Sequence, residues 1–207
     1  MVTQALQFAS ADDSEELARA ELYGLLARLW IAPPDAQVLE QFEVAVTQAP
    51  QPGAFLEAPW QALVGAMRAT TAPLAAEEFD ALFLGVGKPE VFAYGSFYLT
   101  GFLNEKPLAQ LRTDLAALGL ERAEQNNQTE DHVAALFEVM RYLIAGDDVA
   151  VCNLEQQRRM FRTHLQPWVE KLCDTLEAHP RAQLYGPLAG FTRAFMQVEI
   201  QGFDLLP

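Results

Sequence analysis

The clearest structural signal in this chain is the sequence Val133-Ala-Ala-Leu-Phe-Glu-Val-Met-Arg-Tyr-Leu-Ile144. Five of its apolar residues recur at positions i, i+3, i+4, i+7 and i+11: Val133, Leu136, Phe137, Met140 and Ile144. This spacing places their side chains on one face of an α-helix, and Gly146 follows where such a helix would end. The sequence therefore predicts an amphipathic helix that buries this apolar face.

Helical spacing extends from this segment through the rest of the chain. Further helical segments are predicted at about residues 17–29, 38–46, 59–67, 79–83, 97–103, 107–118, 154–165, 168–176 and 184–198. No alternating apolar and polar run of useful length predicts a strand. We therefore expect an all-α fold, a single bundle-like domain of about nine to ten helices over residues 1–207. A polar linker or hinge is predicted at residues 121–129.

The predicted ends of the helices rest on capping and turn residues. Asp13 or Ser14 is expected to cap the first helix, whose apolar stripe consists of Leu17, Ala18, Leu22, Leu25, Leu26 and Leu29. Pro107 is expected to open a later helix, which Gly119 stops. The intervening residues 85–95 are too rich in Gly and Pro for a helix interior, and Ser96 is expected to cap the next apolar turn.

Composition and charge limit the classes of partner. The chain is 51% hydrophobic and 10% aromatic, which excludes a disordered protein. Its 14 basic and 28 acidic residues give a net charge of −14, so nucleic acids and anionic membranes are not expected partners, whereas a cationic partner is. The start of the chain lacks the basic region of a signal peptide, and no long apolar run predicts a membrane span. We expect a cytoplasmic protein with two buried, reduced thiols at Cys152 and Cys173.

Motifs for catalysis and metal binding are incomplete in this sequence. Gly85-Val-Gly-Lys88 lacks the first glycine and the Ser or Thr of a phosphate-binding loop. Tyr94-Gly-Ser-Phe-Tyr98 has aromatic residues at both outer positions of a nucleophile elbow. The three histidines are too scattered for a standard zinc spacing. We therefore expect no enzyme activity, no metal and no cofactor. A helical metalloenzyme or a nucleotide hydrolase is the alternative from another class.

The polar cluster Glu130-Asp-His132 stands at the start of the predicted helix that contains residues 133–144. Its acidic groups would favour a helix N-terminus, with Thr129 or Asn127 as the cap, and this structural role competes with a functional one. His132 likewise has two interpretations. It is either a group that titrates near neutral pH beside Asp131, or a neutral imidazole hydrogen-bonded within its own helical turn.

Four segments taken in order resemble one known family. They are Glu78-Phe-Asp-Ala-Leu-Phe-Leu-Gly85, Tyr94-Gly-Ser-Phe-Tyr-Leu99, Glu130-Asp-His132 and Phe161-Arg-Thr-His-Leu-Gln-Pro-Trp168. In this succession the chain resembles the TorD/DmsD/NarJ family of redox-enzyme maturation chaperones. The family often has Glu-Pro-x-Asp-His where this chain has Gln128 and Thr129 before its Asp-His pair.

The resemblance implies a chaperone that binds the apo catalytic subunit of a molybdenum oxidoreductase, its twin-arginine signal peptide, or both. Such a chaperone assists cofactor insertion and delays export until maturation. The alternative within the family is a NarJ-like assembly chaperone that binds the enzyme body and has no export role. The residues implied in peptide binding are Leu82, Phe83, Tyr94, Gly95, Ser96, Glu130, Asp131 and His132. The linker at residues 121–129 would permit helix exchange in a homodimer, which the sequence does not decide.

The charge of the chain suits such a target. A twin-arginine signal joins two guanidinium groups to an apolar stretch, and arginine prefers planar carboxylate partners such as Asp131 or Glu130. The apolar stretch needs a hydrophobic groove. We therefore expect the groove to supply the affinity and the carboxylates to supply the selectivity.

Overall fold

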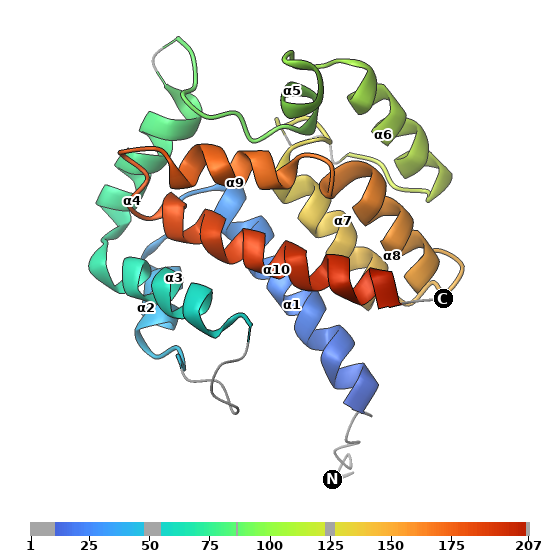
Figure 1. Ribbon diagram of the computed structural model, residues 1–207, viewed down its shortest axis with the longest axis horizontal. Coiled ribbons are helices and arrows are strands. Elements are labelled where there is room, and N and C mark those ends of the chain that lie inside the picture. Colours follow the sequence, from blue (N-terminus) through green and yellow to red (C-terminus); the bar gives the residue numbers. More distant parts are fainter. Residues whose placement is uncertain (1–10, 48–54, 86, 123–126, 206–207) are drawn as a thin grey trace, which may run out of the picture.

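The computed structural model describes residues 11–47, 55–85, 87–122 and 127–205 (Figure 1). Within these residues the chain forms ten α-helices and two short π-helical segments and no extended strand. Their bounds are α1 Ala11–Ile31, α2 Ala36–Glu43, α3 Glu57–Ala69, α4 Ala72–Phe79, η1 Asp80–Leu84, α5 Gly95–Thr100, α6 Lys106–Ala117, α7 Val133–Ala145, α8 Leu154–Met160, η2 Phe161–Leu165, α9 Val169–Glu177 and α10 Tyr185–Leu205. The predicted all-α fold is confirmed.

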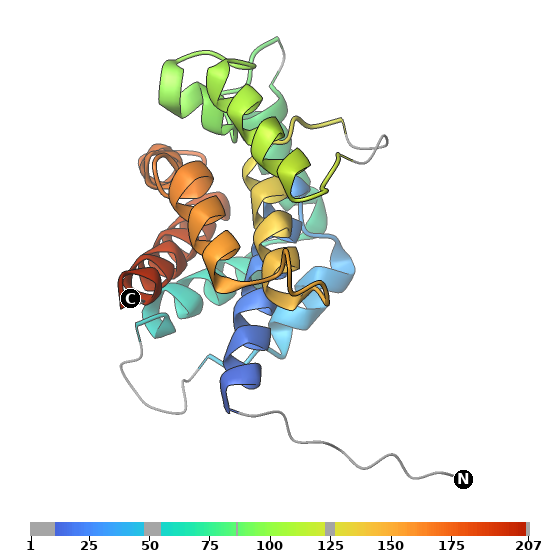
Figure 2. The ribbon, with the colours of Figure 1, turned by 90° about the vertical axis from the view of Figure 1, so that its right-hand side faces the viewer.

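The helices surround a core that α1, α7 and α10 cross. α1 packs along α7, and α10 packs against both α9 and α3 (Figure 1). The short helices α5 and α6 lie together at one end of the molecule, which is the top of both views (Figure 2).

The apolar stripes predicted for α7 and α10 are the faces that these helices bury. In α7 the side chains of Val133, Leu136, Phe137 and Met140 are buried, and Gly146 ends the helix as predicted. The aromatic side chains of four residues in the C-terminal third of the chain are also buried: Phe161, Trp168, Phe191 and Phe195. Burial of each such apolar side chain contributes about 1.5–3 kcal/mol, so these residues supply much of the stability of the fold.

The stripe predicted for α1 is wrong in part. Leu17 is 56% exposed, and the helix already includes Asp13 and Ser14, so neither residue is its cap. Leu26 and Leu29 of the predicted stripe are buried, and the same face includes Tyr23, Ala27 and Trp30, which the stripe did not contain. The Tyr23 ring contacts Phe137 of α7 and Phe195 of α10, so this face of α1 is the one that meets both helices.

Two other features bear on the sequence-based expectations. Among the described residues no helix is both long and apolar enough to cross a membrane. Neither cysteine forms a disulfide, and Cys173 is buried whereas Cys152 is only half-buried, so the expectation of two buried thiols holds for Cys173 alone. Burial raises the pKa of the Cys173 thiol to about 12.

Candidate functional site

The start of α5 and the start of α7 are joined by backbone hydrogen bonds. An isolated antiparallel bridge pairs Tyr94 with His132. Gly95 N donates to the carbonyl of Asp131 at 2.9 Å, and Val133 N donates to the carbonyl of Ala93 at 2.9 Å. The structure therefore brings two of the segments singled out in the sequence, residues 94–96 and 130–132, into direct contact.

Asp131 is buried at this junction, and its carboxylate is fully used inside the protein. Its Oδ2 accepts hydrogen bonds from Ser96 N at 2.9 Å and from Ser96 Oγ at 2.5 Å. Its Oδ1 accepts a hydrogen bond from Thr129 Oγ1 at 2.6 Å. Ser96 lies inside α5 and does not cap it as predicted, because the carboxylate that meets the first turn of the helix belongs to Asp131. Asp131 therefore fastens the two segments together.

His132 is the N-cap residue of α7, in place of the predicted Thr129 or Asn127. Its Nδ1 accepts a hydrogen bond from Ala134 N at 3.2 Å. Burial lowers the pKa of His132 to about 4 although the neighbouring Asp131 charge acts in the opposite direction. The imidazole is thus neutral at physiological pH, in agreement with the second of the two interpretations given above.

Tyr94 and Gly95 complete the junction. The Tyr94 ring meets the His132 ring edge-to-face at 5.0 Å between centroids, and its hydroxyl donates to Gln128 Oε1. Burial raises the pKa of Tyr94, and the Asp131 charge adds to the increase. Gly95 lies against the indole of Trp168, where a Cβ would stand 2.9 Å from Nε1. A side chain at position 95 would displace the buried Trp168 ring, so glycine is required there for packing.

Leu82 and Phe83 belong to a different part of the core. Leu82 is fully buried, and its carbonyl accepts hydrogen bonds from Glu90 N and Val91 N. The rings that pack around Phe83 are those of Trp30, Phe79 and Tyr185. These two residues hold the loop after η1 on the core, and none of their hydrogen bonds or ring contacts is with residues 94–96 or 130–132.

Beside the junction a cavity of about 260 Å³ opens between α1, the end of α6 and α7. Its lining is Ala27, Arg28, Ile31, Leu115, Leu120, Glu121, Arg122, Glu130, Ala134, Ala135, Glu138 and Val139. The small side chains of Ala27, Ala134 and Ala135 leave the space that larger residues would fill. The volume lies slightly below the ~300–1,000 Å³ of typical small-ligand sites, and it suits one or two apolar side chains of a peptide.

Glu130 is the predicted site residue that lines this cavity. Its Oε2 accepts hydrogen bonds from Arg112 Nε at 3.0 Å and from Arg112 Nη2 at 2.9 Å. Its Oε1 lies 3.9 Å from Arg122 Nε. Burial alone would raise the pKa of Glu130, but the hydrogen bond and charge of Arg112 and the charge of Arg122 lower it. Glu130 is therefore an anion at neutral pH.

The sequence did not single out the other residues of the cavity. Glu121 and Glu138 add two exposed carboxylates to the lining that Glu130 shares. Among the described residues the Glu138 carboxylate pairs with Arg141 at 2.8 Å, and no ion pair is formed by Glu121. Ala27 of α1 and Ala134 of α7 line the same cavity because these two helices pack together, so no local pattern could have revealed the apolar wall.

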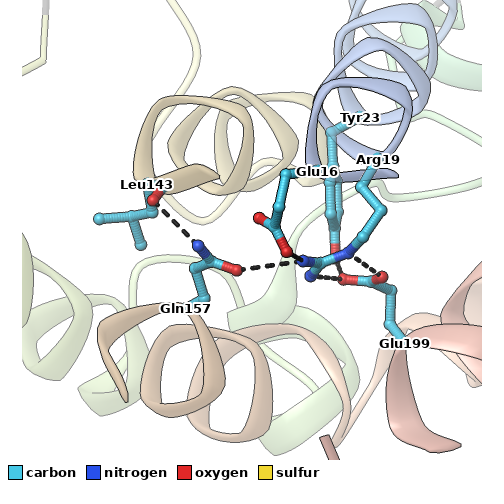
Figure 3. A network of polar contacts seen from close by, with 6 residues as sticks. All are labelled: Glu16, Arg19, Tyr23, Leu143, Gln157 and Glu199. Atoms are coloured by element: carbon cyan, nitrogen blue, oxygen red, sulfur yellow. Dashed lines mark hydrogen bonds and ion pairs between the residues drawn. The ribbon is translucent and has the colours of Figure 1, made fainter. Parts of the chain in front are cut away.

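A larger cavity of about 630 Å³ lies between α1, α8 and α10, and some of the residues that line it form a partly buried polar network (Figure 3). Arg19 donates to both oxygens of Glu199, at 2.9 and 2.8 Å, and the Tyr23 hydroxyl donates to Glu199 Oε2 at 2.9 Å. Arg19 also donates to Glu16 at 2.6 Å and to Gln157 at 3.3 Å. Each charge in this network already has a partner. The network therefore joins the helices, and its charged groups are not available to bind a ligand.

Further polar contacts between helices went unpredicted. The Glu78 carboxylate accepts hydrogen bonds from Leu184 N and Tyr185 N at 2.9 Å and thereby caps α10. His164 Nε2 lies 2.9 Å from Asp114 Oδ2, which ties η2 to α6. Among the described residues no three His, Cys, Asp or Glu side chains gather in a group that could hold a metal ion.

The sequence of this chain matches a known protein family. The model of the family described as "Nitrate reductase delta subunit" matches residues 50–174, more than half of the chain. A "Chaperone protein TorD" from Vibrio cholerae serotype O1 is 28% identical over 138 residues, which are 63% of this chain and 63% of that protein. The match thus spans less than two thirds of this relative. A "Chaperone protein TorD" from Aliivibrio fischeri is 24% identical over 200 residues, 88% of this chain and 93% of that protein.

The family match covers η1, the α5–α7 junction and the residues that follow them through α9 as far as position 174. It therefore includes all eight residues that the sequence motifs implied in peptide binding and most of the lining of the smaller cavity. The all-α fold and this match together show that the chain belongs to the nitrate reductase delta subunit family, the same TorD/DmsD/NarJ family that its motifs resemble.

Proposed function

We propose that this protein is a cytoplasmic, non-enzymatic chaperone for the catalytic subunit of a molybdenum oxidoreductase. It binds the apo subunit, its twin-arginine signal peptide, or both, and it assists cofactor insertion and delays export until the enzyme is mature. The family and the relatives' name "Chaperone protein TorD" support this class of function. The observation that carries the proposal is the apolar cavity whose lining includes three carboxylates, Glu121, Glu130 and Glu138.

The cavity matches both halves of a twin-arginine leader. Its walls of Ile31, Leu115 and Val139 take apolar side chains, and Glu130 presents a carboxylate to a guanidinium group. Burying one leucine contributes ~1.5–3 kcal/mol, whereas an exposed ion pair contributes ~0.2–1 kcal/mol. The walls therefore supply most of the affinity, and the carboxylates distinguish arginine from other residues and speed the encounter.

Asp131 and His132 serve this site indirectly. They hold residues 94–96 against the start of α7 and thereby set the position of Glu130, which precedes them in the chain. Of the two carboxylates considered as partners for arginine, Glu130 is the one at the cavity, since that of Asp131 is buried and occupied by Ser96 and Thr129.

Filling the cavity tests the proposal. Ala135 lies half-buried in the cavity wall, and Ala135→Leu places three additional carbon atoms there. We expect calorimetric titration with a twin-arginine leader peptide to show at least about tenfold weaker binding, equivalent to ~1.4 kcal/mol. Ala116→Leu is the matched control, because Ala116 is an exposed alanine of α6 outside the cavity lining. Equal affinities for the two variants would place the leader elsewhere.

The second candidate is a NarJ-like assembly chaperone that binds the enzyme body without a role in export. The family description favours it, since it names a subunit of an enzyme rather than an export step. Binding of the apo subunit with and without its leader separates the two functions. Undiminished binding of the leaderless subunit, together with no binding of the isolated leader, would favour the second candidate.

A further inference from the structure

Two arginines of the chain itself meet at the carboxylate that faces the cavity. Arg112 from α6 donates twice to Glu130 Oε2, at 3.0 and 2.9 Å, and Arg122 from the turn after α6 stands 3.9 Å from Glu130 Oε1. Each oxygen of Glu130 thus already faces a guanidinium group. This is the same pair of groups that a twin-arginine leader would bring.

The exposures of the three side chains allow another guanidinium group to replace Arg112 or Arg122 at Glu130. The side chain of Glu130 is only 14% exposed, whereas those of Arg112 and Arg122 are 53% and 40% exposed. The carboxylate is therefore fixed in the wall of the cavity, and its partners reach it from solvent. An incoming guanidinium group would replace a solvated one of the same kind, so the exchange leaves no buried charge unpaired.

We propose that Arg112, assisted by Arg122, is an internal competitor that occupies the arginine-reading carboxylate Glu130 until the leader displaces it. This inference rests on the proposed function, since it concerns the same cavity and the same class of peptide. It explains how a chaperone with a net charge of −14 binds a cationic leader without holding it too tightly for release. The ligand gains Glu130 only as the protein's own arginine gives it up, so the net gain is small.

The test is a set of titrations with a synthetic leader peptide in which Arg-Arg precedes an apolar stretch of leucine and alanine. A second peptide replaces Arg-Arg with Gln-Gln. We expect Arg112→Gln to bind the Arg-Arg peptide about two- to fivefold more tightly than the wild-type protein does, or ~0.4–1 kcal/mol. Binding of the Gln-Gln peptide should not change. If Arg112 had a purely structural role, Arg112→Gln would instead weaken the binding of both peptides.

Two controls separate competition from general electrostatics. Arg162→Gln changes the net charge equally but breaks an exposed ion pair with Asp204 outside the cavity lining, and it should leave both affinities unchanged. In a Glu130→Gln background, Arg112→Gln should have no effect, because nothing remains to compete for. An effect that persists in that background would show that Arg112 merely repels the peptide, and this would overturn the inference.

A direct readout is the exchange of the Arg112 Nε proton with solvent, measured by NMR. Exchange should become faster when the Arg-Arg peptide binds, because the hydrogen bond to Glu130 is lost. If the wild-type protein binds neither peptide, the proposed function fails. If it binds the Arg-Arg peptide while Arg112→Gln binds it equally or more weakly, only the inference of an internal competitor fails.

Discussion

Replacing Asp131 with alanine is expected to destabilise the fold through the junction between α5 and α7. The substitution removes the acceptor of three hydrogen bonds, from Ser96 N, Ser96 Oγ and Thr129 Oγ1. Ser96 is completely buried, so water does not replace the lost acceptor. Loss of an N-cap costs about 0.5–2 kcal/mol, and each polar group left unsatisfied in the interior costs about 1–3 kcal/mol. Because these terms overlap, we expect a total loss of about 2–4 kcal/mol.

Urea unfolding followed by tryptophan fluorescence measures this loss directly. Trp168 is a suitable reporter because it packs against Gly95 and stacks on Tyr98 at 5.7 Å. Glu130→Ala is the matched control from the neighbouring position. Glu130 forms its ion pairs with half-exposed arginines, so Glu130→Ala should lower the free energy of unfolding by less than about 1 kcal/mol.

The same variant also separates positioning from recognition. Because Asp131 acts by holding the junction, Asp131→Ala should weaken twin-arginine and twin-lysine leaders by equal factors. An unfolding free energy within about 0.5 kcal/mol of the wild-type value would refute the argument that this carboxylate fastens the two helices. A loss of binding confined to the twin-arginine leader would give Asp131 a direct part in recognition.

Two further predictions concern buried ionisable groups. Arg19→Met should destabilise the protein by about 3–5 kcal/mol in urea unfolding, because the substitution removes the bidentate partner of the buried Glu199 carboxylate. The double variant Arg19→Met, Glu199→Met should recover much of this loss. A double variant no more stable than Arg19→Met would refute this explanation. Folding lowers the pKa of His132 from its ordinary value of 6.5 to about 4. The stability that the neutral imidazole contributes is therefore complete above pH 6.5 and is lost progressively as the pH falls toward 4, by about 3 kcal/mol in all. His132→Asn keeps an acceptor at the cap and should show a shallower loss between pH 7.5 and 5, and equal losses in the two proteins would contradict the assignment.

Helical periodicity predicted the fold well where one face of a helix is buried along its whole length. α7 and α10 are such helices, and the expected residues of α7 from Val133 to Met140 lie in the core. In α1 the leucine pattern was right for Leu26 and Leu29 and wrong for the exposed Leu17, and it missed the buried Tyr23 and Trp30. The π-helical turns η1 and η2 add a residue to a turn, which a period of 3.6 residues does not anticipate.

The candidate site was only partly predictable, because its contacts join residues that are far apart in the chain. The motifs identified Glu130 and the junction residues, but the cap of α5 is supplied by Asp131, 35 positions after Ser96. The apolar wall combines Ala27 of α1 with Ala134 of α7. No pattern local to either helix indicates that pairing, so the cavity appears only when the helices are packed.

The linker at residues 121–129, of which positions 123–126 lie outside the described residues, is tied at both described ends to the cavity. Leu120, Glu121 and Arg122 stand on one side, and Glu130 stands on the other. A dimer that exchanged everything after this segment would assemble each pocket from two polypeptides, with α1 and α6 from one and α7 from the other. Stoichiometry would remain one leader per chain, but occupancy would then depend on protein concentration, because dilution would take the two halves of every pocket apart.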